Sequence, residues 1–130
     1  MNNNKYYILD DPALLALGGG NRAASSLIVR GHRTQHIKLL APALCVLQAD
    51  QMREGVGIHV GALEMLDTVD LDFASTLAVS QLVRKGVPLG IAHARVAAAP
   101  SAYRPDGATI ATVAPENYAR VEVRVLDLNA

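Results

Sequence analysis

The chain has no tryptophan, one phenylalanine and four tyrosines in 130 residues. So few aromatic side chains argue against the rows of stacking rings with which OB-fold and RRM-like proteins hold single-stranded nucleic acid. A core must instead consist of leucine, valine, isoleucine and alanine, and an apolar fraction of 51% is typical of a globular protein. At this length we expect one folded domain, residues 1–130.

The sequence also lacks net charge, paired cysteines and long apolar runs. Twelve basic and twelve acidic side chains cancel, so no overall field attracts the protein to nucleic acid or to an anionic membrane. The single Cys45 cannot form an internal disulfide, and no apolar run approaches the ~20 residues of a membrane span. The first residues, MNNNKYY, lack the apolar stretch of a secretory signal. We therefore expect a cytoplasmic protein without membrane contact.

Short apolar runs alternate with segments of helical pattern along the whole chain. We expect strands at residues 6–9, 37–41, 65–69, 108–113 and 121–128. The helices expected between them cover residues 13–17, 21–30, 43–53, 73–86, 87–99 and 115–120, and residues 57–64 form a loop or a short helix. Asn21 and Asp72 stand where helix caps belong. Such alternation predicts an α/β fold with a mainly parallel sheet.

The stretch LDDPALLALGGGNRAA, residues 9–24, contains two competing signals. Its glycines fit the pattern of a dinucleotide-binding turn, but that turn must follow a strand directly, and here residues 11–17 intervene. We therefore expect Gly18 to Gly20 to end a helix. Asp10 lies at the carboxyl end of the first strand, where parallel sheets bind ligands. It is either a carboxylate for metal or phosphate chemistry or the cap of the next helix.

Four segments in order, from Tyr6 to Leu128, together resemble a PIN domain, the fold of many small metal-dependent ribonucleases. They are YYILDDPALLAL, LLAPALCVLQA, VPLGIAHARVAAA and ATIATVAPENYARVEVRVLDL. The resemblance implies a three-layer α/β/α sandwich and an endoribonuclease that uses Mg²⁺ or Mn²⁺. The family includes the toxins of toxin–antitoxin pairs, so the resemblance also implies a homodimer, RNA binding and an antitoxin-like regulatory partner.

The chain departs from the acidic pattern of this family. Asp10 stands at the first acidic position, but the second falls on Gln48, the third on His93, and the late turn position on Ala114. Mg²⁺ requires several oxygen ligands in a near-octahedral array. We therefore expect a pseudo-nuclease, a PIN-like domain that has lost metal-dependent cleavage, needs no cofactor, and serves as a binding or regulatory module.

Two alternatives remain open. Asp10, Asp11, Glu116 and His93 could form a rebuilt metal site, and the imidazole would favour Mn²⁺, Zn²⁺ or Ni²⁺ over Mg²⁺. The vacated cleft could instead hold a small molecule. Without a metal, we expect His93 to hydrogen-bond Asp10 or Gln48 and to have its charged form favoured by Asp10.

The densest basic run lies between the second expected helix and the second expected strand. It comprises Arg30, His32, Arg33, His36 and Lys38. Arg30, Arg33 and Lys38 could contact RNA phosphates or an acidic partner segment. They could equally be solvated cations near a helix C-terminus. For Cys45, we expect a small buried apolar side chain rather than a nucleophile.

Overall fold

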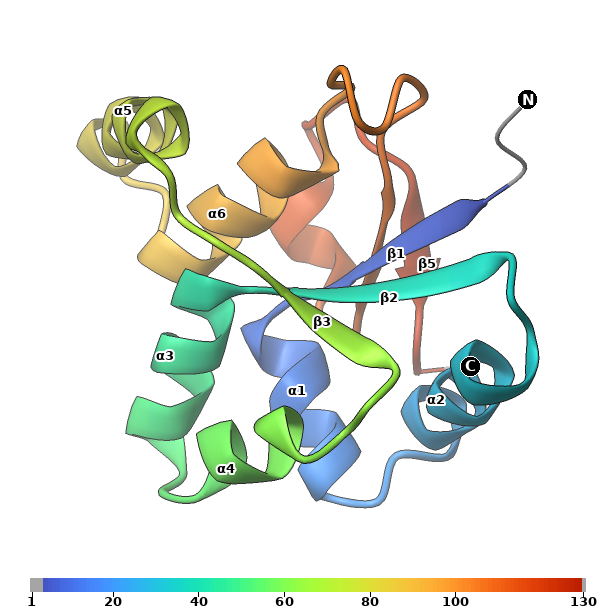
Figure 1. Cartoon of the computed structure of the whole chain (residues 1–130). Coiled ribbons are helices and arrows are strands. Elements are labelled where there is room, and N and C mark those ends of the chain that lie inside the picture. The colour runs from blue at the N-terminus through green and yellow to red at the C-terminus, as the bar shows by residue number, and fades with distance from the viewer. Residues whose placement is uncertain (1–3, 130) are drawn as a thin grey trace.

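The computed structural model describes residues 4–129 and contains a five-stranded sheet in the order β3-β2-β1-β4-β5 (Figure 1). All four pairs of neighbouring strands are parallel. The strands are β1 (Lys5–Leu9), β2 (Ile37–Pro42), β3 (Leu66–Val69), β4 (Thr109–Thr112) and β5 (Val125–Asp127). The sequence-based prediction of an α/β fold with a parallel sheet is thereby confirmed.

Helices cover both faces of this sheet and complete a three-layer α/β/α sandwich. They are α1 (Asp11–Gly18), α2 (Arg22–Arg33), α3 (Ala43–Met52), α4 (Val56–Gly61), α5 (Phe73–Arg84) and α6 (Leu89–Ala98), with a 3-10 turn, η1 (Pro115–Tyr118). α6 packs on β1, β2 and β4, and α3 contacts both α1 and α6. α5 packs chiefly on α6 and stands away from the strands (Figure 1). No helix within residues 4–129 is long and apolar enough to cross a membrane.

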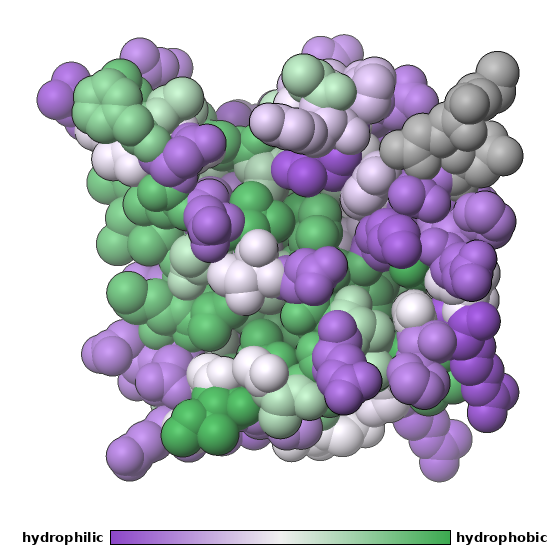
Figure 2. All heavy atoms as spheres, in the orientation of Figure 1, coloured by the Kyte–Doolittle hydropathy of each residue, from purple (hydrophilic) through white to green (hydrophobic). Residues whose placement is uncertain are grey.

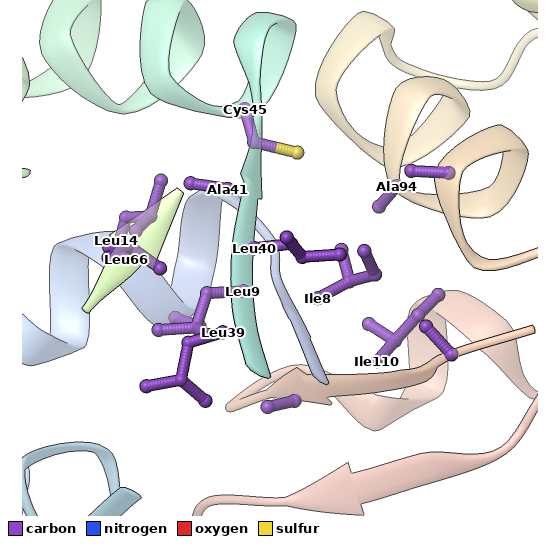
Figure 3. Close-up of a cluster of buried hydrophobic side chains, with 14 of the residues drawn as sticks. Ile8, Leu9, Leu14, Leu39, Leu40, Ala41, Cys45, Leu66, Ala94 and Ile110 are labelled. Carbon is purple, nitrogen blue, oxygen red and sulfur yellow. The ribbon is translucent and has the colours of Figure 1, made fainter. Parts of the chain in front are cut away.

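The two faces of the central strands supply most of the core (Figure 3). Ile8 is in register with Leu40 on one side and with Ile110 on the other, and all three side chains lie on the face covered by α6. Leu39 and Leu66, also in register, lie on the opposite face. Alternation of side chains along a strand requires this division. The core is therefore aliphatic, as the scarcity of aromatic residues predicts.

Helix caps follow the sequence closely. The side chains of Asp10, Asn21 and Asp72 each accept a hydrogen bond from an amide three residues later and so begin α1, α2 and α5. Gly19 is the cap residue after α1, so the triple glycine ends a helix as expected and does not form a dinucleotide turn.

The last strand is shorter than predicted. We expected residues 121–128, but β5 covers Val125–Asp127. The amide of Val121 donates to Tyr118 O and the amide of Val123 donates to Val121 O, so local turns take the place of ladder bonds there. The segment left open as a loop or short helix contains α4.

Candidate functional site

The carboxyl ends of β1 and β4 place Asp10 and Thr112 at the same edge of the sheet, since Leu9 of β1 is in register with Ala111 of β4. Both polar side chains are completely buried. This is the edge at which open parallel sheets generally bind ligands. The structure therefore places Asp10 at the carboxyl end of the first strand, as the order of elements in the sequence predicts.

Both carboxylate oxygens of Asp10 bind groups of the protein itself. Oδ1 accepts a hydrogen bond of 3.0 Å from the amide of Ala13, which is the helix-cap contact. Oδ2 accepts a hydrogen bond of 2.7 Å from the hydroxyl of Tyr118 on η1. Asp10 is thus the cap of α1, one of the two roles that the sequence leaves open, and it also anchors the turn after β4.

Burial controls the protonation of this pair. Loss of water around Asp10 raises its pKa to about 6, although hydrogen bonds from Thr112, Tyr118 and Ala13 act in the opposite direction. Burial and the neighbouring Asp10 carboxylate also raise the pKa of the Tyr118 hydroxyl far above its usual value. Near neutral pH the tyrosine is therefore a firm hydrogen-bond donor, and the carboxyl group titrates close to physiological pH.

The neighbouring carboxylate of Asp11 packs against α6. Its Oδ1 is buried and has no hydrogen-bond partner among residues 4–129. A Cβ atom built on Gly90 would lie 2.5 Å from that oxygen, so only glycine leaves room for it. Cys45 donates from Sγ to the carbonyl of Gly90 at 3.1 Å, and its sulfur points from α3 towards α6 (Figure 3). Burial raises the pKa of Asp11 and, more strongly, that of the Cys45 thiol. Cys45 is a buried thiol, as expected.

His93 does not form the predicted hydrogen bond to Asp10 or Gln48. Its Nδ1 accepts a hydrogen bond of 3.2 Å from the amide of Leu44 at the start of α3, and Nε2 is buried with no hydrogen bond to the described part of the chain. Burial lowers its pKa and outweighs the backbone of Asp70 and the charge of Asp72, which favour the charged form. The expectation of a favoured imidazolium is therefore wrong, because the ring has lost its water and lacks Asp10 as a partner.

The other two positions at which the resemblance expects an acidic residue lie around this edge, but their side chains do not complete a set of metal ligands. Gln48 is half-buried on α3, and Ala114 is half-buried before η1, where its amide donates to Thr112 Oγ1 at 3.0 Å. Glu116, the proposed replacement carboxylate, is exposed. The residue of η1 that reaches Asp10 is Tyr118. No pattern in the sequence indicates this role, because a short 3-10 turn has no apolar periodicity.

Within the described residues, no group of three or more histidine, cysteine or acidic side chains lies close enough together to hold a metal ion. The proposed set of Asp10, Asp11, Glu116 and His93 is therefore not assembled. What the structure does assemble is a buried cluster of carboxyl and hydroxyl groups, in which Tyr118 donates to Asp10.

The basic candidates lie in another part of the molecule. Arg30 and Arg33 are in the last turns of α2, and Lys38 is near the start of β2. All three side chains are exposed. They are therefore available to a partner, but they do not form part of the edge that holds Asp10.

No protein-family model matches this chain, and no curated protein sequence matches it. The resemblance to a PIN domain therefore stays a prediction from the sequence motifs.

Proposed function

We propose that this chain is a cytoplasmic PIN-like pseudo-nuclease that works as a binding module and does not cleave RNA. The observation that carries the proposal is the engagement of Asp10. Its Oδ1 bonds the Ala13 amide and its Oδ2 bonds the Tyr118 hydroxyl. The one acidic position that the sequence retains is thus used to hold α1 and η1 in place.

Metal affinity depends on the number of carboxylates that reach the ion. Each carboxylate about 4 Å from a dication contributes roughly 8 kcal/mol of gross attraction at an effective dielectric of 20, before desolvation. Gln48 and Ala114 supply no charge, and His93 bonds the backbone of α3 instead of facing Asp10. A Mg²⁺ site requires several oxygen ligands. A single carboxylate whose two oxygens already accept hydrogen bonds is therefore expected to bind Mg²⁺ weakly.

A surface on α5 and the start of α6 supports the binding role. We define the α5 face as Phe73, Leu77 and Val83 of α5 together with Leu89 of α6, which are 78%, 52%, 38% and 41% exposed. Figure 2 shows hydrophobic side chains over α5 and along the flank that α6 and α3 form below it. Exposed apolar side chains gathered on one flank commonly mark an interaction site.

The partner that fits the α5 face is a second copy of this chain. Exposed Asp70 and Asp72 lie before the N-terminus of α5, and exposed Arg84 and Lys85 lie at its C-terminus. The Ser75 amide keeps the pKa of Asp72 low, so this end is anionic at neutral pH. Two α5 helices packed antiparallel about a two-fold axis would bring each acidic end onto the basic end of the partner. A two-fold interface needs such self-complementarity.

One observation favours the alternative of a rebuilt metal-dependent ribonuclease. Asp11 Oδ1 is buried with no partner among the described residues, and such an oxygen is a free ligand position. A cleavage assay separates the two functions: a mixed-sequence RNA pool is incubated with the protein in Mg²⁺ and, separately, in Mn²⁺. We expect no cleavage by the parent protein in either metal.

Three variants make that assay decisive. Asp10→Asn and Asp11→Asn remove the two buried carboxylates, and Asp67→Asn removes an exposed one on β3 as a matched control. The binding proposal would be overturned if the parent and Asp67→Asn cleave RNA and Asp10→Asn or Asp11→Asn does not. Circular dichroism must show that the inactive variant is still folded. That result would establish a ribonuclease.

A further inference from the structure

A pocket lies at the amino ends of the strands, opposite to the end that holds Asp10. It is formed by the first residues of β1, by the loop before β4, and by Arg124 just before β5. Its volume is about 710 Å³, within the range of pockets that take small organic ligands and cofactors. Because it involves neither Asp10 and Asp11 nor the α5 face, it is independent of the function proposed above.

Three cationic side chains line this pocket. Lys5, Arg104 and Arg124 come from separate parts of the chain, and Asp106 is the acidic residue among the lining residues. Like charges brought to one pocket repel each other, and an anionic ligand relieves that repulsion. In a chain with no net charge, such a local excess of positive charge is a specific feature of this edge.

Both guanidinium groups are held in place by the protein. Arg124 donates from Nη2 to the carbonyl of Asp106 at 2.9 Å and from Nε to Thr109 Oγ1 at 3.4 Å. Arg104 donates from Nη2 to Ala97 O at 3.4 Å and lies 5.8 Å from the centroid of the Tyr6 ring. The Nη1 donors take no part in these bonds. Guanidinium groups fixed in this way lose little entropy when they bind a phosphate, whose oxygens match their planar donors.

Aromatic rings stand beside these cations. Tyr6 and Tyr7 both line the pocket, in a chain with only five aromatic residues. Tyrosine rings provide faces on which nucleobases stack. The volume also exceeds what a phosphate group alone requires. We propose that this pocket binds a nucleoside monophosphate, with Arg104 and Arg124 on the phosphate and the ring of Tyr6, the tyrosine that lies against Arg104, beside the base.

Isothermal titration of the full chain in low salt tests this assignment with four ligands. They are AMP, adenosine, inorganic phosphate and a single-stranded RNA trinucleotide without a terminal phosphate, which offers phosphodiesters instead of a monoester. We expect saturable binding of AMP, at least tenfold weaker binding of the other three ligands, and a marked loss of AMP affinity on raising the salt concentration.

Substitutions locate the site. Arg124→Gln should weaken AMP binding about tenfold. The Lys5 side chain makes no hydrogen bond to the described residues, so Lys5→Gln should weaken AMP binding about threefold without disturbing the fold. Arg30→Gln, an exposed cation on α2, is the matched control and should leave AMP affinity unchanged. Absence of saturable AMP binding, or equal affinity in the parent and both pocket variants, would overturn the proposal. Tighter binding of the trinucleotide than of AMP would identify RNA and would also reject a free nucleotide as the ligand.

Discussion

The protonation of Asp10 links a single buried side chain to the stability of the whole fold. In the unfolded chain its pKa is near 3.8, and in the folded protein it is about 6. Between these pH values the folded state binds more protons than the unfolded state. The contribution of Asp10 to stability is therefore greatest below about pH 4 and is lost as the pH rises through about 6. At about 1.4 kcal/mol per pK unit, this shift costs about 3 kcal/mol at neutral pH.

Asp10→Asn should remove that cost. Asparagine is a good helix cap, and with its oxygen bonded to the Ala13 amide its Nδ2 can donate to the hydroxyl oxygen of Tyr118. We expect the variant to be up to about 3 kcal/mol more stable than the parent at pH 7.5 and about equally stable at pH 4. Denaturant unfolding across this pH range measures the difference. His93, whose lowered pKa acts in the opposite direction as the pH falls below 6.5, is common to both proteins and cancels.

Asp67→Asn is the control for the loss of one negative charge, since Asp67 is exposed on β3. Its stability difference from the parent should stay nearly constant with pH. A pH-independent difference in Asp10→Asn as well would show that Asp10 has an ordinary pKa in the folded state, contrary to this account.

At the scale of elements, α1 and α6 approach each other through Asp11 and Gly90. The three atoms nearest to a Cβ built on Gly90 all belong to the Asp11 carboxylate, the closest at 2.5 Å. Gly90→Ala should therefore destabilise the parent by about 1–3 kcal/mol through overpacking. In an Asp11→Ala background the obstacle is gone, and the higher helix propensity of alanine should make the same change stabilising by up to about 1 kcal/mol.

Urea unfolding of the four proteins of this cycle measures the coupling directly. Gly61→Ala serves as the matched glycine, because it also lies in a helix and a Cβ there would have no neighbour within 4 Å. Its effect should be the same with and without Asp11. If Gly90→Ala changes the free energy of unfolding with the same sign in both backgrounds, the contact between Asp11 of α1 and α6 is not what excludes a side chain at residue 90.

The caps and strands could be predicted from local sequence, but the face that α6 turns to the aspartates could not. Gly90 through Ala94, and then Ala97 and Ala98, are all buried. A helix buried on most sides has no amphipathic pattern from which to assign its faces. His93 was therefore predicted to face Asp10, whereas Gly90 faces Asp11 and His93 lies against the start of α3. The bond from Tyr118 to Asp10 joins residues 108 positions apart and depends on tertiary structure alone.

At the scale of the whole molecule, the three surfaces described above are spatially separate. The edge with Asp10 is buried and internally bonded, the basic pocket opens at the other end of the strands, and α5 projects from the flank with its apolar face exposed. The dimer proposed above would bury that face, on which Phe73 alone is 78% exposed. We therefore expect the oligomeric state to respond to α5 more than to any other surface.

Sedimentation velocity over a range of protein concentrations tests this expectation. The parent should be a dimer at micromolar concentration, and Phe73→Asp should raise its dissociation constant at least tenfold because a charge would be buried at the interface. Tyr103→Asp changes an equally exposed aromatic residue outside the α5 face and should leave the dimer intact. A parent that stays monomeric at 100-fold higher concentration would reject the dimer.

Charge reversal tests the antiparallel arrangement itself. Asp70→Lys alone places like charges at both ends of the paired helices, and Lys85→Glu alone does the same with the opposite sign. Each should weaken the dimer about tenfold, because like charges at an interface are strongly disfavoured. The double variant restores opposite charges across the two-fold axis and should recover most of the affinity. Independent, additive losses in the double variant would contradict this pairing, since only residues that meet across the interface can compensate each other.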